Sequence, residues 1–122
     1  LLFEYEKEAF MLVNVRDPKE EYTKYSFPSK TFEFMLSGTI TLCTELPGIP
    51  SEYKDHLVMI PTNKVEEIMN GMNEIINMKE EERTEFGLKA RMFVLEEKNQ
   101  YIQSGKIIEF IHSLIKQKRS NQ

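Results

Sequence analysis

One segment, in which a loop, a helix and a strand follow each other without a break, constrains the fold of this chain most strongly. It spans residues 26–44. Proline suits the first turn of a helix and glycine the position after the last turn, so Pro28 and Gly38 mark the two ends of the helix. The β-branched residues that follow, from 39 to 44, favour a strand. This order predicts an α/β unit whose loop lies where such folds bind ligands.

Apolar runs on both sides of this segment predict the other strands and helices. Residues 10–15 are dominated by apolar side chains, which is typical of a strand buried on both faces of a parallel sheet. Residues 56–60 predict a third short strand, and apolar spacing predicts helices over residues 1–8, 62–78, 79–98 and 101–116. We therefore expect one α/β domain over residues 1–122, a partial Rossmann-like fold. Its parallel sheet of about three strands is covered by helices, three of them at the C-terminal end.

The last three helices each show an apolar face. The face of the helix over residues 62–78 comprises Val65, Ile68, Met69, Met72, Ile75 and Ile76. The face of the helix over residues 79–98 comprises Phe86, Ala90, Phe93 and Val94. The last helix carries Ile102, Ile107, Ile108, Ile111, Leu114 and Ile115. Apolar residues at helical spacing normally face a core, so we expect the methionines Met69, Met72 and Met78 to be core residues.

Composition and charge exclude several classes of protein. Hydrophobic residues make up 40% and charged residues 30% of the chain, which is ordinary for a globular domain. The net charge of −4 argues against a nucleic-acid platform. There is no apolar run of about 18 residues to span a bilayer and no signal-peptide pattern. The first residue is Leu1, so we expect the chain to be a piece of a longer protein.

The one cysteine and the two histidines do not indicate a catalytic or metal site. Cys43 is the one cysteine and lies in a β-branched run, so we expect a buried apolar filler in a reducing compartment. His56 and His112 lack metal-ligand spacing. Neither a dinucleotide fingerprint nor a P-loop is present. We therefore expect no metal and no resident cofactor.

The start of the helix that follows Pro28 is a candidate anion site. Backbone N–H groups at a helix start suit a phosphate or diphosphate. Lys30 and Glu33 lie three residues apart on one face, where the cation suits a phosphate and the carboxylate suits paired sugar hydroxyls. The competing interpretation is a surface ion pair between the two side chains. A ligand role requires Glu33 to face the carboxyl ends of the strands, whereas a surface role pairs it with Lys30 or Lys24.

The same residues resemble a known family. Residues 25–39, followed by residues 46–53, closely resemble the carboxyl-terminal, donor-binding domain of retaining, nucleotide-sugar-dependent glycosyltransferases of the GT-B fold, in the group called group 1 or family 4. That family shows a Pro-Ser-Lys-x-x-Glu-Tyr-Met-Ala-x-Gly run, a strand, and a Pro-Gly-Ile-Pro-type loop. A later segment fits as well, through Glu85, Gly87, Lys89, Ala90 and Arg91. The resemblance extends from about Ala9 to Ile115.

The resemblance implies roles for particular residues. Glu33 matches the second carboxylate of the family's Glu-x7-Glu motif, which holds the ribose hydroxyls of the donor nucleotide. The first carboxylate falls at Tyr25, where this chain departs from the motif. The turn formed by Phe27, Pro28 and Ser29 would lie near the donor sugar or diphosphate. Lys30 would be a phosphate partner, and Gly48 would line the far wall of the cleft.

The resemblance also implies a reaction, the transfer of a sugar from a nucleoside-diphosphate sugar to a glycan or lipid-linked acceptor. Many such enzymes build capsule and other polysaccharides. The N-terminal acceptor domain and the first half of the donor domain are missing from the sequence, so we expect this fragment to be inactive alone. The parent is expected in the cytoplasm or at the inner face of the membrane. The alternative is a non-enzymatic α/β interaction module, in which the apolar sheet edge forms a binding or homodimer surface.

Overall fold

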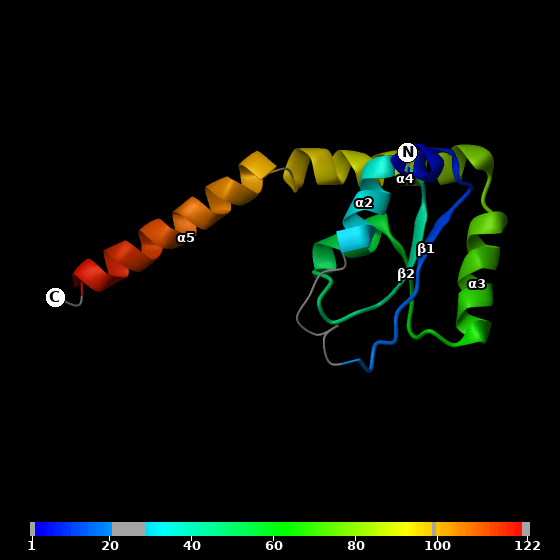
Figure 1. Cartoon of the computed structure of the whole chain (residues 1–122), viewed down its shortest axis with the longest axis horizontal. Coiled ribbons are helices and arrows are strands. Elements are labelled where there is room, and N and C mark those ends of the chain that lie inside the picture. Colours follow the sequence, from blue (N-terminus) through cyan, green and yellow to red (C-terminus); the bar gives the residue numbers. More distant parts are fainter. Residues whose placement is uncertain (1, 21–28, 99, 121–122) are drawn as a thin grey trace.

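A computed structural model describes residues 2–20, 29–98 and 100–120 of the chain (Figure 1). Helices and strands alternate in the first half, and three helices follow. In chain order the elements are α1 (Leu2–Glu8), β1 (Leu12–Asn14), α2 (Ser29–Ser37), β2 (Thr41–Thr44), the 3-10 helix η2 (Ser51–His56), β3 (Val58–Ile60), α3 (Val65–Ile76), α4 (Glu80–Glu97) and α5 (Gln100–Ser120).

The three strands form a parallel sheet in the order β1-β2-β3. β2 is the central strand, and all four of its residues are buried. Its Leu42 pairs with Val13 on one side and with Val58 on the other. The expected α/β class and three-stranded parallel sheet are therefore confirmed. The strands are shorter than expected; β3, for example, begins at Val58 because His56 belongs to η2.

Helices cover both faces of the sheet. Successive residues of a strand point to opposite faces, so Cys43 packs in a core formed with α2 and α4, whereas Leu42 packs in a core formed with β3 and α3. Figure 1 shows α2 and α3 on opposite sides of the strands. Met35, fully buried on α2, and Ile75, fully buried on α3, represent the two layers.

β1 is not buried on both faces, contrary to the expectation for residues 10–15. Its Val13 is 40% exposed and the preceding Phe10 is 50% exposed. Among the described strands β1 is an edge strand, paired only with β2. α3 packs over β2 and β3, and Met11 and Val15 beside β1 pack only partly buried against the same core.

The buried face of α3 differs from the expected one, because Gly71 makes the closest approach to the sheet. A Cβ atom at Gly71 would lie 2.7 Å from Leu42 Cδ1 and 2.8 Å from Ile60 Cγ2. The contact face is therefore centred on Gly71 and Ile75, and residues on the other sides of the helix point to solvent. The expectation that Val65, Met69 and Ile76 are core residues is therefore wrong, because they are 73%, 57% and 54% exposed. Met72 and Met78 do pack against the core.

α4 crosses the C-terminal end of α2. Gly38 has φ +81°, a left-handed conformation that favours glycine and that ends α2 as predicted. A Cβ atom at Gly87 of α4 would lie 2.1 Å from the Gly38 carbonyl oxygen. The two helices therefore meet backbone to backbone. The expected apolar face of α4 is confirmed at its buried residues Ala90, Phe93 and Val94.

α5 does not cover the sheet, unlike the other helices. It extends away from the rest of the molecule (Figure 1), and every side chain from residue 104 to residue 120 is exposed. The large apolar residues within this range are between 47% and 63% exposed. The expectation that helices cover the sheet therefore holds for α2, α3 and α4 and is wrong for α5.

Candidate functional site

Polar side chains join β1, β2 and α2 at the carboxyl edge, the edge where all three parallel strands end. The Asn14 side-chain amide, at the end of β1, donates a hydrogen bond of 2.9 Å to Thr31 Oγ1 on α2. The Arg16 backbone N–H donates one of 2.9 Å to Thr44 Oγ1 at the end of β2. Thr31 and Thr44 are fully buried. These bonds hold the first turn of α2 at the carboxyl edge.

Arg16 brings a cation to this edge. Arg16 as a whole is half-buried, and its Nε atom is buried without a hydrogen-bond partner among the described residues. A guanidinium with an unsatisfied donor suits an anionic ligand, because carboxylate and phosphate oxygens accept from it. We did not assign Asn14 or Arg16 to the site from the sequence. The available signal was their place at the end of a predicted strand of a parallel sheet.

The residues expected at the site fall into two groups. Lys30 is exposed on the first turn of α2, and Gly48 is half-buried in the loop after β2, so both follow the carboxyl edge. Ser29 is the first residue of α2. Tyr25, Phe27 and Pro28 lie outside the described residues.

Glu33 lies against α1. Its carboxyl group lies close to that of Glu6, a residue only 4% exposed. Burial raises the pKa of Glu6, Glu33 raises it further, and Lys30 opposes the shift. The Glu6 backbone carbonyl also accepts a bond of 2.7 Å from Thr39 Oγ1. Among the described residues Glu33 forms no salt bridge with Lys30. Lys24, the other expected partner, lies outside the described residues.

A small pocket of about 360 Å³ opens beside the loop that follows β2. Its walls combine the segment after β1, represented by Pro18, with residues from Glu45 to Lys54. The Lys54 ammonium pairs with the Glu45 carboxylate at 3.2 Å on its rim. The loop is anchored to β3, since the Glu45 backbone N–H donates to the Ile60 carbonyl. The exits of β1 and β2 thus share one concave surface at the carboxyl edge.

Cys43 and the two histidines hold structural or exposed positions. Cys43 is 1% exposed, and burial raises the pKa of its thiol to about 12, which confirms a buried filler. His56 stacks on Phe93 with ring centroids 4.3 Å apart. His112 is exposed on α5. In the part of the chain that the structure describes, no three His, Cys, Asp or Glu side chains are arranged to hold a metal ion.

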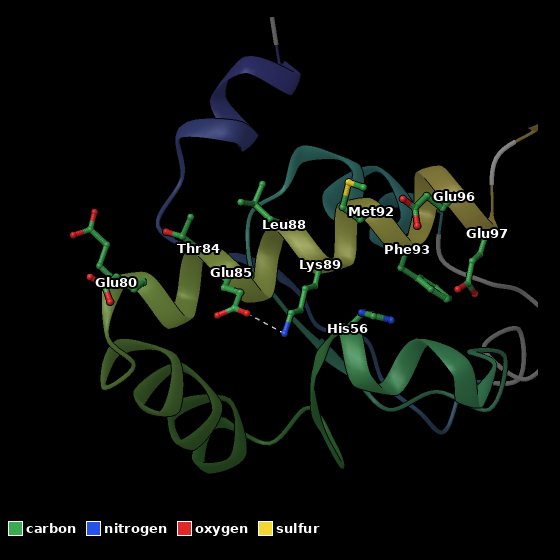
Figure 2. Close-up of a pocket in the computed structure, with 11 residues that line it drawn as sticks. His56, Glu80, Thr84, Glu85, Leu88, Lys89, Met92, Phe93, Glu96 and Glu97 are labelled. Atoms are coloured by element: carbon green, nitrogen blue, oxygen red, sulfur yellow. Dashed lines mark ion pairs between the residues drawn. The ribbon is translucent and has the colours of Figure 1, made fainter.

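A larger open pocket, of about 750 Å³, runs along α4 and ends near His56 and Phe93 (Figure 2). Its walls are apolar and acidic side chains of α4. None of the residues assigned to the carboxyl edge lines it. Because glutamates outnumber cations in its lining and Lys89 already pairs with Glu85 at 3.0 Å, we do not place the anion site there.

Comparisons with known proteins found no relative of this chain. No family model, no curated protein and no solved structure matches the chain. Within residues 2–20, 29–98 and 100–120, none of the helices combines the length and apolar character required to cross a membrane. The functional argument therefore rests on the residues and the geometry of the chain itself.

Proposed function

We propose that this chain forms part of the donor site of a retaining glycosyltransferase with a Rossmann-like donor domain. The parent enzyme would transfer a sugar from a nucleoside-diphosphate sugar to a glycan or lipid-linked acceptor. The observation that supports this best is the bond between Asn14 and Thr31, which fixes the start of α2 at the carboxyl edge of a parallel sheet. Ligands of open α/β sheets bind at that edge.

The groups at the edge suit a diphosphate. α2 directs its free backbone N–H groups and the positive end of its dipole toward the carboxyl edge. Lys30 on α2 and Arg16 in the segment after β1 add two cations. Such groups stabilise the negative charge that develops on a departing diphosphate. In this proposal the protein supplies electrostatic stabilisation of the leaving group and no nucleophile.

Glu33 supplies the sugar contact in this proposal. A carboxylate accepts hydrogen bonds from two adjacent ribose hydroxyls. Burial raises the pKa of the neighbouring Glu6, and Glu33 raises it further. In this proposal the Glu33 carboxyl group provides the acceptor oxygens that ribose needs. Its half-buried position gives it contact with both Glu6 and solvent.

The remaining parts of the site belong to the proposed parent protein. The acceptor domain and the first half of the donor domain would complete the cleft, and this chain alone would be inactive. The nucleotide sugar is a substrate, and no resident cofactor is proposed. The parent would act in the cytoplasm or at the inner face of the membrane.

A non-enzymatic interaction module is the second candidate. The observation that favours it is the open edge at β1, where Val13 and Phe10 are exposed. An exposed apolar edge strand is a template for pairing with another strand. This role requires no nucleotide, so nucleotide binding separates the two candidates.

Saturation-transfer NMR with nucleoside diphosphates and nucleotide sugars tests the donor site. We expect ribose-proton signals for the wild type that are lost in Glu33→Ala and kept in Glu74→Ala. Glu74 is an exposed glutamate on α3 and therefore a matched control. Absence of any nucleotide signal, both for this chain and for a longer protein that contains it, would contradict the glycosyltransferase proposal.

A further inference from the structure

α5 presents a continuous apolar stripe to solvent. Ile107, Ile111 and Leu114 lie at spacings of four and three residues, so they line one face of the helix. Neighbouring residues widen this stripe. It comprises Ile107, Ile108, Phe110, Ile111, Leu114 and Ile115, which are 47–63% exposed. Most helical stability in proteins comes from packing an apolar face, and contiguous exposed apolar surface marks an interaction site. α5 therefore needs a partner surface.

α5 is also basic. Four basic side chains, Lys106, Lys116, Lys118 and Arg119, accompany one acidic side chain, Glu109, for a net charge of +3 with histidine neutral. At 100° per residue, Lys106 and Arg119 border the apolar stripe on its two sides, and Lys118 continues it by one turn. A partner surface that matches α5 is therefore an apolar groove with acidic borders.

The pocket along α4 has this composition. Its lining includes Leu88 and Met92, which are 49% and 50% exposed. Glutamates stand at both of its ends: Glu80 and Glu81 at one, Glu96 and Glu97 at the other. Within the described residues none of these four glutamates forms a salt bridge. Figure 2 shows Leu88 and Met92 between the acidic ends.

The charges on the two surfaces have matching spacings. Glu81 and Glu96 are 15 residues apart on α4, or about 22 Å along the helix axis. Lys106 and Arg119 are 13 residues apart on α5, or about 20 Å. When the basic end of α5 lies at the acidic start of α4, the two helices are antiparallel. Because the helices are antiparallel, the dipole of each helix also runs opposite to that of its neighbour.

We propose that α5 docks into the α4 groove of a second copy of this chain, with the same contact made reciprocally across a two-fold axis. A second copy is required because α5 leaves the end of α4 and extends away from its own groove (Figure 1). In such a dimer each chain contributes its α5 to one contact and its α4 groove to the other contact. Ile111, in the middle of the stripe, lies opposite Leu88 and Met92 of the partner.

Sedimentation velocity of the 122-residue chain and three single variants tests the contact. We expect a dimer for the wild type. Ile111→Glu removes the apolar contact on α5, and Met92→Glu removes it in the groove, so each variant should weaken dimerisation by at least about tenfold. Met69→Glu is the matched control, because Met69 is an exposed methionine on α3 outside the groove. The control should dimerise as the wild type does.

A mixing experiment identifies the pairing. The Met92→Glu chain keeps an intact α5, and the Ile111→Glu chain keeps an intact groove. An equimolar mixture therefore forms a heterodimer with one complete contact, and it should associate more tightly than either variant alone. Arg119→Glu combined with Glu81→Lys in one chain should likewise restore dimerisation lost in either single variant.

Other outcomes would overturn the proposal. A monomeric wild type would exclude the second copy and point to α5 folding back on its own chain. Loss of the dimer in Ile111→Glu with no effect of Met92→Glu would indicate that α5 associates with another α5. Loss of the dimer in Val13→Lys, which places a charge on the edge strand, would indicate pairing through β1 instead.

Discussion

Glu6 on α1 and Glu33 on α2 bring two carboxyl groups close together, and burial, with Glu33 as a further cause, raises the pKa of Glu6. Two carboxyl groups can share a hydrogen bond when one of them holds a proton. Glu6 is the more buried member, at 4% exposure, and its Oε2 atom has no hydrogen-bond partner among the described residues. The pair therefore connects the attachment of α1 to the protonation of one buried group, next to the residue that we propose as a ribose ligand.

The Glu6–Glu33 pair makes stability depend on pH in a defined direction. Burial, and then Glu33, raise the pKa of Glu6 above its ordinary value of 4.5. The folded state therefore holds a proton that the unfolded state loses, so the stabilisation is complete below pH 4.5 and is lost as pH rises through the raised pKa. Glu6→Gln mimics the protonated form, and its advantage over the wild type should grow with pH.

Chemical denaturation from about pH 4 to about pH 8 measures this dependence. Glu8→Gln, an exposed glutamate of the same helix, is the control and should follow the wild type. A constant difference in unfolding free energy between Glu6→Gln and wild type across this range would contradict the prediction.

The approach of α3 to the sheet predicts opposite effects for two glycine substitutions. Gly71→Ala places a Cβ atom 2.7 Å from Leu42 Cδ1, which costs about 1–3 kcal/mol of strain and outweighs a gain of about 1 kcal/mol in helix propensity. We expect a net loss of roughly 1–2 kcal/mol in the free energy of unfolding. Gly105→Ala meets nothing within 4 Å on α5 and should raise helicity instead.

Urea denaturation measures the first effect, and far-ultraviolet circular dichroism measures the second. Gly87→Ala extends the series, since its Cβ atom would meet the Gly38 carbonyl oxygen, a backbone atom that cannot rotate away. Its loss should exceed that of Gly71→Ala. Equal stabilities of Gly71→Ala and the wild type would show that the helix shifts on the sheet without strain.

The bond from Asn14 to Thr31 should be visible as an energetic coupling. Thr31→Val keeps the shape of a fully buried side chain but leaves the Asn14 amide without its acceptor, at a cost of about 1–3 kcal/mol. Asn14→Ala removes the donor, so Thr31→Val should cost less in that background. A double-mutant cycle by urea denaturation should give a coupling of about 0.5–1.5 kcal/mol. Additive losses would show that the bond contributes nothing to holding α2 at the edge.

The thiol of Cys43 should react only when the fold opens. Burial raises its pKa to about 12, and the residue is 1% exposed, so the reactive thiolate is scarce at neutral pH. We expect labelling by a disulfide reagent to be at least ~100-fold slower in the native protein than in the protein unfolded in urea. Labelling at comparable rates in both states would mean that β2 is exposed in solution.

The sequence by itself determined the local elements and the sheet type. Proline and glycine end the regular elements through their backbone restrictions, so α2 was predicted between Pro28 and Gly38. Short apolar runs between helices require parallel strands, and β2 has the predicted buried character. These are properties of a residue and its near neighbours, which is why a sequence carries them.

Only the tertiary structure decided which residues from distant segments meet. Gly71 brings α3 close to Leu42, which turned Met69 outward although its spacing suited a core face. Glu6 and Glu33 meet because α1 packs on α2, across 27 positions of sequence. α5 has the periodic apolar spacing of a packed helix, yet the fold leaves it exposed. Periodicity shows that a face is apolar, whereas the close approach of backbones and the direction of each connection decide what that face contacts.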